Sequence, residues 1–154
     1  MLAIGDKAPL FVTQGTAGEV HLAAMLELGA VALYFFPRAM TGGCTVEALE
    51  FNEALPEFAA LGVAVVGVSV DPVARQQRFR EKYGLALQFA SDHKRSIGVA
   101  YGTLKGDETT TNERDTVVVD REGVIRLAYQ RVTAKGHAAQ VLADVKRLRD
   151  QGLL

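Results

Sequence analysis

Residues 34–47 read Tyr34-Phe35-Phe36-Pro37-Arg38-Ala39-Met40-Thr41-Gly42-Gly43-Cys44-Thr45-Val46-Glu47. An apolar run ends there in a proline, a turn rich in glycine follows, and the only cysteine of the chain opens a helix-like segment. This order predicts a buried strand that delivers Cys44 to the first turn of a helix. Unpaired backbone amides and the positive end of the helix favour a thiolate over a thiol at that place. Thr41 can offer its hydroxyl to the same pocket.

A second interpretation of Cys44 rests on its apolar neighbours. Cys44 lies on an apolar stripe at helical spacing, and free cysteines are often small buried side chains without chemistry. Position alone therefore leaves open both a reactive thiol and an inert, buried one.

Two short apolar runs flank this segment and predict the centre of a sheet. Val31–Phe36 and Val63–Val70 are nearly all apolar and are bounded by Gly or Pro, as expected of parallel strands covered on both faces. The helix predicted between them ends at Gly62 and contains Pro56, where we expect a kink or break. Its apolar side comprises Cys44, Ala48, Phe51, Leu55 and Phe58, and its acidic side comprises Glu47, Glu50, Glu53 and Glu57.

The remainder of the chain continues to alternate helix and strand signals. Asp71 and Pro72 are predicted to cap a helix that runs through Tyr83 and stops at Gly84. Further elements follow: a weak strand over 87–90, a short helix near 96–101, a hairpin of 116–120 and 124–129, and an amphipathic helix over 135–151. The alternation predicts an α/β fold with helices flanking a central sheet, and 154 residues suit a single domain spanning 1–154.

Charge and composition exclude several classes of function. The chain has 17 basic and 18 acidic side chains and a formal net charge of −1, without a long block of like charges, so nucleic acid is not expected as a partner. No apolar stretch reaches the roughly 18 residues of a membrane span and no leader is visible, so a soluble cytoplasmic protein is expected. The single cysteine rules out an intramolecular disulfide and a structural zinc site of several cysteines.

The three histidines do not form a ligand set. His21, His93 and His137 are scattered, and no ligand-spaced cluster of histidines or carboxylates exists. We therefore expect neither a metal nor an organic cofactor, and each histidine is predicted to be a surface or loop residue.

The segment from Pro37 to Cys44 matches P-x-x-x-T-x-x-C, the signature of peroxiredoxins, and its flanks resemble the bacterioferritin comigratory protein, or peroxiredoxin Q, branch. The resemblance continues through Gly67-Val-Ser-Val-Asp71, Phe79, Lys82-Tyr83, Ser91-Asp92, Tyr101-Gly102 and Arg114-Asp-Thr-Val-Val-Val-Asp120. It implies a thioredoxin-like fold with peroxiredoxin-type additions around a mixed sheet. It also implies a thiol-dependent peroxidase for hydrogen peroxide and small organic hydroperoxides.

The resemblance further implies roles for five residues. Cys44 would be the peroxidatic nucleophile, and Pro37 would shield it. Thr41 would hydrogen-bond the thiolate and the peroxide, with Arg114 beside them. Glu47 would orient that arginine, whereas without the family it counts as one member of a solvated acidic face.

Three positions depart from the family pattern. Leu49 and Gly98 stand where this branch often carries a resolving cysteine, so the chain resembles the one-Cys form. The sulfenic acid would then be reset by an external thiol from thioredoxin, glutaredoxin or a low-molecular-weight compound. Gly42 stands where the branch usually has proline, which should ease unwinding of the turn. A monomer or weak dimer is expected.

Three other functions compete with a peroxidase. A dithiol oxidoreductase would need a second cysteine where Thr41 stands. A non-enzymatic redox sensor would be oxidised once without turnover, and a thioredoxin-fold binding module would have an unreactive thiol. Catalytic loss of peroxide with a supplied thiol distinguishes the enzyme from all three.

Overall fold

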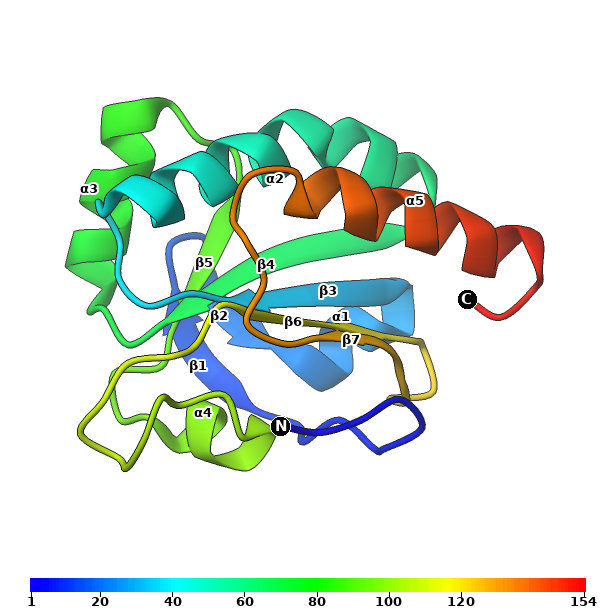
Figure 1. The fold of residues 1–154 in the computed structure, drawn as a ribbon, viewed down its shortest axis with the longest axis horizontal. Helices are drawn as coiled ribbons and strands as arrows, with labels where there is room; N and C mark the ends of the chain where they lie inside the picture. The colour runs from blue at the N-terminus through cyan, green and yellow to red at the C-terminus, as the bar shows by residue number, and fades with distance from the viewer.

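The computed structural model describes residues 1–154, which form seven strands and five helices (Figure 1). In chain order these are β1 (Val12–Gly15), β2 (Gly18–His21), α1 (Leu22–Leu28), β3 (Ala30–Phe35), α2 (Gly42–Ala60), β4 (Val63–Ser69), α3 (Val73–Tyr83), β5 (Gln88–Ser91), α4 (Ser96–Tyr101), β6 (Asp115–Val119), β7 (Ile125–Tyr129) and α5 (His137–Asp150). None of the helices is long and apolar enough to cross a membrane.

All seven strands join one mixed sheet in the order β2-β1-β5-β4-β3-β6-β7. β3 and β4 are parallel, as predicted, and β5 continues parallel to β4. β6 runs antiparallel to β3 and forms the predicted hairpin with β7, which turns at Gly123 with a φ of 82°. The prediction of a mixed central sheet flanked by helices is confirmed.

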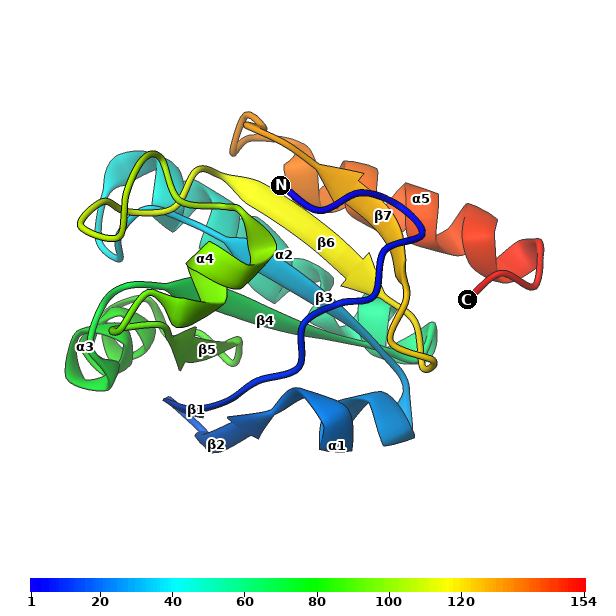
Figure 2. The ribbon, with the colours of Figure 1, turned by 90° about the horizontal axis from the view of Figure 1, so that it is seen from below.

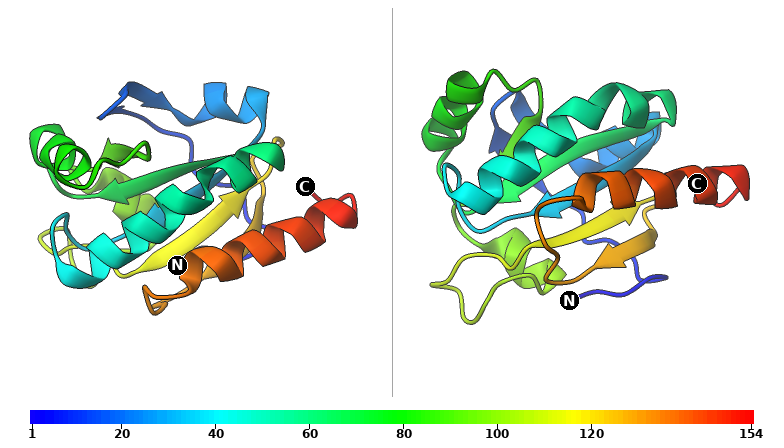
Figure 3. Two further views of the ribbon diagram at one scale, coloured as in Figure 1. Left: turned by 90° about the horizontal axis from the view of Figure 1, so that it is seen from above. Right: turned by 45° about the horizontal axis from the view of Figure 1, so that its top comes forward.

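Helices cover both faces of the sheet, which explains why its central strands are apolar throughout. Successive residues of β3 alternate between two hydrophobic clusters: Tyr34 packs with α2, α3 and α5, and Leu33 and Phe35 pack with α1 and α4. α2 and α5 lie side by side on one face (Figure 3), and α4 lies on the other (Figure 2). Cys44 belongs to the cluster under α2.

Parts of two local predictions are wrong. α2 continues without a break through Pro56, which is exposed, because Phe51 and Phe58 on either side of it are fully buried and hold both halves of the helix on the core. Asp71 does not cap α3, since Pro72 is the N-cap residue and makes no side-chain cap bond. The Asp71 carboxylate instead accepts a hydrogen bond from Ala39 N at 2.8 Å.

Candidate active site

The turn between β3 and α2 presents Cys44. Beyond β3, Phe36 N donates to Val68 O of β4 at 3.1 Å, and the chain then leaves the sheet. α2 starts at Gly42, which puts Cys44 in the first helical turn, as predicted. Cys44 is 1% exposed, whereas the neighbouring residues 41–43 are exposed. The thiol therefore lies under the turn rather than on the surface.

Arg114 connects Cys44 with Glu47. It directly precedes β6, whose Asp115 pairs with Phe35 of β3, so the sheet itself brings Arg114 to the turn. Its Nη1 donates to Glu47 Oε1 at 2.8 Å, and its Nη2 donates to Cys44 Sγ at 3.5 Å. Cys44 and Glu47 are three residues apart on α2 and share a face of the helix. One guanidinium group thus contacts the carboxylate and the sulfur together.

Glu47 is fully buried, unlike the other acidic residues of α2. Burial raises the pKa of Glu47 from 4.5 to about 7, against the opposing charge and hydrogen bond of Arg114. Burial acts to lower the pKa of Arg114, but the charges of Cys44 and Glu47 outweigh it and the net direction is upward. The placement of Glu47 on a solvated acidic face is therefore wrong, because the side chain is buried and pairs with Arg114 instead of facing solvent.

Thr41 and Pro37 lie in the same turn. Thr41 is the N-cap residue of α2, and its exposed hydroxyl donates to Arg38 O at 3.1 Å. The hydroxyl proton is thereby directed away from Cys44, and the expected hydrogen bond to the sulfur is not formed in this structure. Pro37 is half-buried where the chain leaves the sheet.

His137 corrects the prediction that all three histidines lie on the surface or in loops. It is the first residue of α5 and is buried, with Nε2 2.8 Å from Thr116 Oγ1 and its ring edge-on to Phe51. Burial, followed by the charge of Arg114, lowers the pKa of His137 to about 4. The imidazole is therefore neutral near pH 7. Its sequence signal is its place on the apolar stripe of α5, four residues before Val141.

Tyr34 is a second buried polar side chain, and it lies within an apolar run of the sequence. Its ring stacks on Phe51 and Phe36, with centroid distances of 4.5 and 5.4 Å. Burial and then the charges of Glu47 and Cys44 raise the pKa of Tyr34 well above its ordinary value. The core beneath Cys44 is therefore aromatic, and the Tyr34 phenol within it stays protonated.

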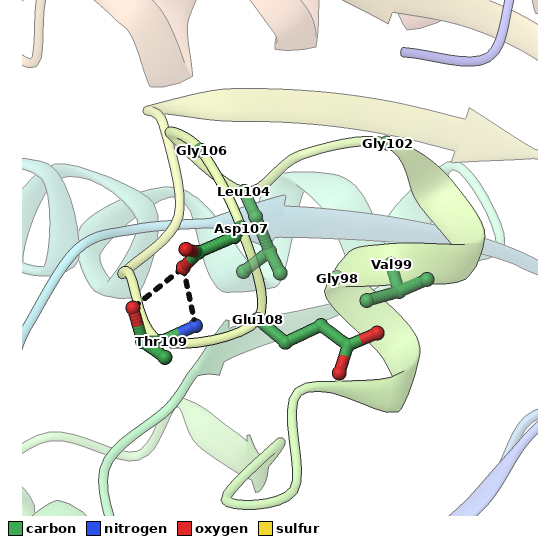
Figure 4. A pocket seen from close by; sticks show the side chains of 8 residues that line it. All are labelled: Gly98, Val99, Gly102, Leu104, Gly106, Asp107, Glu108 and Thr109. Carbon is green, nitrogen blue, oxygen red and sulfur yellow. Dashed lines mark hydrogen bonds between the residues drawn. The ribbon is translucent and has the colours of Figure 1, made fainter.

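A surface pocket of about 570 Å³ lies elsewhere, between α4 and the loop that follows it (Figure 4). None of its lining residues is Cys44, Glu47 or Arg114. Gly98 borders this pocket, and a Cβ atom there would lie 2.7 Å from Leu104 Cδ2, so a cysteine at that position would displace Leu104. No group of three or more histidine, cysteine, aspartate or glutamate side chains is placed to hold a metal ion, in this pocket or elsewhere.

Comparison with known proteins relates this site to a family. Residues 4–128 match the AhpC/TSA family. A putative peroxiredoxin Bcp of Coxiella burnetii is 34% identical over 146 residues, which cover 92% of this chain and 97% of that protein. The chain belongs to the peroxiredoxin (AhpC/TSA) family. Because it contains a single cysteine, this peroxiredoxin is a one-Cys form.

Solved structures confirm the thioredoxin-like fold and the branch of this peroxiredoxin. Peroxidoxin BcpB from Mycobacterium tuberculosis matches with a TM-score of 0.89 at 29% identity, covering 97% of this chain and 99% of that one. The bacterioferritin comigratory protein of Xanthomonas campestris, studied for alkyl peroxide reduction, matches with a TM-score of 0.83 at 31% identity, covering 89% and 90%. This peroxiredoxin is a thiol-dependent peroxidase, an oxidoreductase.

Proposed function

We propose that Cys44 is the peroxidatic residue and that it reduces hydrogen peroxide and small organic hydroperoxides. The observation that carries this proposal is the contact of Arg114 with both Cys44 Sγ, at 3.5 Å, and Glu47 Oε1, at 2.8 Å. A cationic donor at a sulfur stabilises the thiolate, which is the form that attacks peroxides. The chain contains no other thiol that could take this role.

In the proposed oxidation, the Cys44 thiolate attacks the terminal oxygen of the hydroperoxide. The S–O bond forms as the O–O bond breaks, so the sulfur becomes a sulfenic acid and the other oxygen leaves and takes up a proton to give water or an alcohol. Arg114 donates to the sulfur and to the oxygen that gains negative charge, and Glu47 orients the guanidinium. Pro37 shields the sulfur, and the Thr41 hydroxyl turns from Arg38 O to the bound peroxide.

The second half of the proposed cycle uses thiols from other molecules. The sulfenic acid condenses with one external thiol to a mixed disulfide and water, and a second thiol releases Cys44 and forms a disulfide of the two reductant sulfurs. Thioredoxin, glutaredoxin or a low-molecular-weight thiol would serve as reductant. A reducing cytoplasm supplies such thiols, and we place the protein there as a monomer or weak dimer.

Burial of the sulfur favours small substrates. Cys44 is 1% exposed, so the bulk of a hydroperoxide must stay outside the turn while its terminal oxygen reaches the sulfur. The residues around Cys44 address only the peroxide group, which all hydroperoxides share. The alkyl peroxide reduction studied in the Xanthomonas campestris relative supports organic hydroperoxides as substrates.

A peroxide-consumption assay with a panel of thiol donors tests this function. The wild-type chain should turn over repeatedly, and Cys44→Ser should not. After one equivalent of peroxide and no reductant, the intact mass should increase by one oxygen atom. A single oxidation without turnover would indicate a sensor, and a strict preference for bulky lipid hydroperoxides would contradict the substrate assignment. A disulfide-linked dimer through Cys44 of two copies, as the main turnover species, would contradict the external-thiol cycle.

A further inference from the structure

One ion pair holds both polar backbone atoms of Ala39. Asp71, two residues after β4, accepts a hydrogen bond from Ala39 N at 2.8 Å. Arg75, in the first turn of α3, donates from Nη2 to Ala39 O at 3.0 Å. The two side chains pair with each other, with Arg75 Nε 3.1 Å from Asp71 Oδ1. Ala39 lies between the end of β3 at Phe35 and the start of α2 at Gly42, in the turn that joins these two elements in Figure 1. This Asp71–Arg75 clasp therefore holds the turn from α3 and the end of β4.

The clasp is anchored in a buried polar network. Ser69 Oγ donates to Asp71 Oδ2 at 2.7 Å, and Gln76 Nε2 donates to Ser69 Oγ and to Ala90 O, both at 2.9 Å. Ser91 Oγ donates to the backbone oxygen of Asp71 at 2.7 Å. Every side chain in this network is buried. Buried hydrogen bonds of this kind rigidify their surroundings, so Asp71 is fixed to β4, β5 and α3.

The turn contains a residue in an unfavourable backbone conformation. Met40, directly after Ala39, has a φ of 69°, in the left-handed region that residues other than glycine rarely adopt. Such a conformation persists only where surrounding contacts hold it. Met40 is partly buried against the cluster that contains Cys44, and the clasp holds the preceding residue. Loss of the clasp would remove one of the two restraints.

We propose that Asp71 and Arg75 are positioning residues that keep the Pro37–Cys44 turn closed, with the Cys44 sulfur beside Arg114. The proposal rests on the function proposed above for Cys44, which neither residue touches. When the clasp is lost, the turn opens and the sulfur leaves Arg114 and becomes exposed. Reduction of peroxide then slows, because it requires the closed site. Reaction with a bulky external reagent speeds up, because it requires an exposed sulfur.

Arg75→Met tests the clasp, because methionine keeps an apolar stem and removes both contacts. Arg78→Met, at an exposed position on the same helix, is the matched control. In Arg75→Met we expect oxidation of Cys44 by hydrogen peroxide to slow by about tenfold and its alkylation by a polymer-linked maleimide to accelerate by about tenfold. Loss of a charged hydrogen bond shifts the equilibrium between the closed and the open turn by that order. Arg78→Met should change neither rate, and Arg75→Lys should recover part of both.

A double mutant shows whether the two residues act through one contact. Asp71→Asn removes the charge that pairs with Arg75, and should shift both rates in the same directions as Arg75→Met. Because both substitutions open the same clasp, the double variant should change the rates no further than the more severe single variant. If the effects of Asp71→Asn and Arg75→Met add in the double variant, the two residues act separately and the proposal of a single clasp is overturned.

Hydrogen–deuterium exchange separates a positioning role from a general loss of stability. In Arg75→Met, uptake should rise at the amides of residues 38–44 and stay unchanged in β3 and β6. Uptake that rises across the sheet, or oxidation and alkylation rates that fall together or do not move, would overturn the proposal. If the wild-type chain fails to consume peroxide, the proposed function of Cys44 fails, but alkylation and exchange still decide whether the clasp holds the turn.

Discussion

Gly43 leaves the room that Arg114 occupies at the start of α2, where a Cβ atom on Gly43 would lie 3.0 Å from Arg114 Nη2. The same nitrogen lies 3.5 Å from Cys44 Sγ. Gly43 does not have a positive φ, so its backbone would accept any residue. The lack of a side chain at position 43 therefore serves the contact between Arg114 and the sulfur.

Gly43→Ala should slow Cys44 oxidation by about tenfold, because a methyl group there pushes the guanidinium and weakens a charged hydrogen bond. Gly42→Ala is the matched control, since nothing lies within 4 Å of its added Cβ atom. Both changes should leave the protein at least as stable, because alanine favours a helix over glycine by about 0.5–1 kcal/mol. Stopped-flow oxidation and thermal unfolding measure the two effects. Equal oxidation rates in the two variants would show that Arg114 tolerates the methyl group.

Arg114→Ala should slow oxidation by about 100-fold to 1,000-fold, the range for losing one donor aimed at developing charge. Full ionisation of a thiol that is already a few per cent thiolate at pH 7 gains only about 30-fold, so ionisation alone cannot account for such a loss. Rates measured at a pH where the thiol of each variant is fully ionised isolate the donor effect. Arg114→Lys, which keeps the charge but not the two-point contact, should lie in between. If the oxidation rate of Arg114→Ala recovers fully at high pH, Arg114 acts only by stabilising the thiolate.

Glu47→Gln should change how stability depends on pH. Because burial raises the pKa of Glu47 to about 7, the folded state holds a proton that the unfolded state releases near 4.5. The contribution of Glu47 to the free energy of unfolding is fully present below about pH 4.5. About 3 kcal/mol of that contribution is lost as pH rises through about 7. Wild type should therefore lose stability relative to Glu47→Gln over that range.

Chemical denaturation of both proteins at several pH values measures this difference. His137 has a pKa lowered to about 4 and acts in the opposite direction, since its stabilising contribution is present above pH 6.5 and is lost as pH falls through about 4. It is present in both proteins, so it cancels in the difference. A pH-independent difference would mean that Glu47 titrates near its ordinary pKa. Glu47→Gln should also slow Cys44 oxidation less than Arg114→Ala does.

Leu49→Cys should form a disulfide with Cys44 after one equivalent of peroxide and gain activity with thioredoxin. Position 49 is exposed and five residues from Cys44 on α2, so the two sulfurs can meet only if the first helical turn unwinds. Gly42 and Gly43 should ease that unwinding. Intact mass should fall by about 2 Da relative to the dithiol. Leu28→Cys, exposed before the start of β3, is the control and should keep a sulfenic or sulfinic product. Persistence of that product in Leu49→Cys would show that the turn stays wound.

Local sequence patterns predict most elements of the fold, and their failures have a physical cause. β3, β4, the β6–β7 hairpin and α5 follow from apolar periodicity and turn residues, which involve only near neighbours. β1 and β2 are not predicted, because these strands are four residues long and mostly exposed, and the seven-residue helix α1 is not predicted either. β1 gains its place by pairing with β5 across more than 70 positions of the chain.

The candidate site divides in the same way. That Cys44 is the only thiol and opens a helix after a buried strand follows from neighbouring residues, and the family motif adds Pro37, Thr41, Glu47 and Arg114 by resemblance. The hydroxyl contact of Thr41 and the clasp on Ala39 do not follow from the sequence, whereas the burial of His137 has one signal there, its place on the apolar stripe of α5. The Thr41 hydroxyl bonds the backbone three residues before it, and the clasp depends on Asp71 and Arg75, which meet the backbone of Ala39 only in the folded chain.

Tertiary structure decided these contacts because strand order brings distant residues together. Arg114 reaches Cys44 across 70 positions because β6 pairs with β3, and Asp71 reaches Ala39 across 32 positions because β4 lies on the other side of β3. A local pattern shows that a segment can be a strand, but not which strand lies beside it. Which strands pair depends on how the whole chain buries its apolar surface. The pairing of β6 with β3 places the Arg114 cation beside the Cys44 thiol.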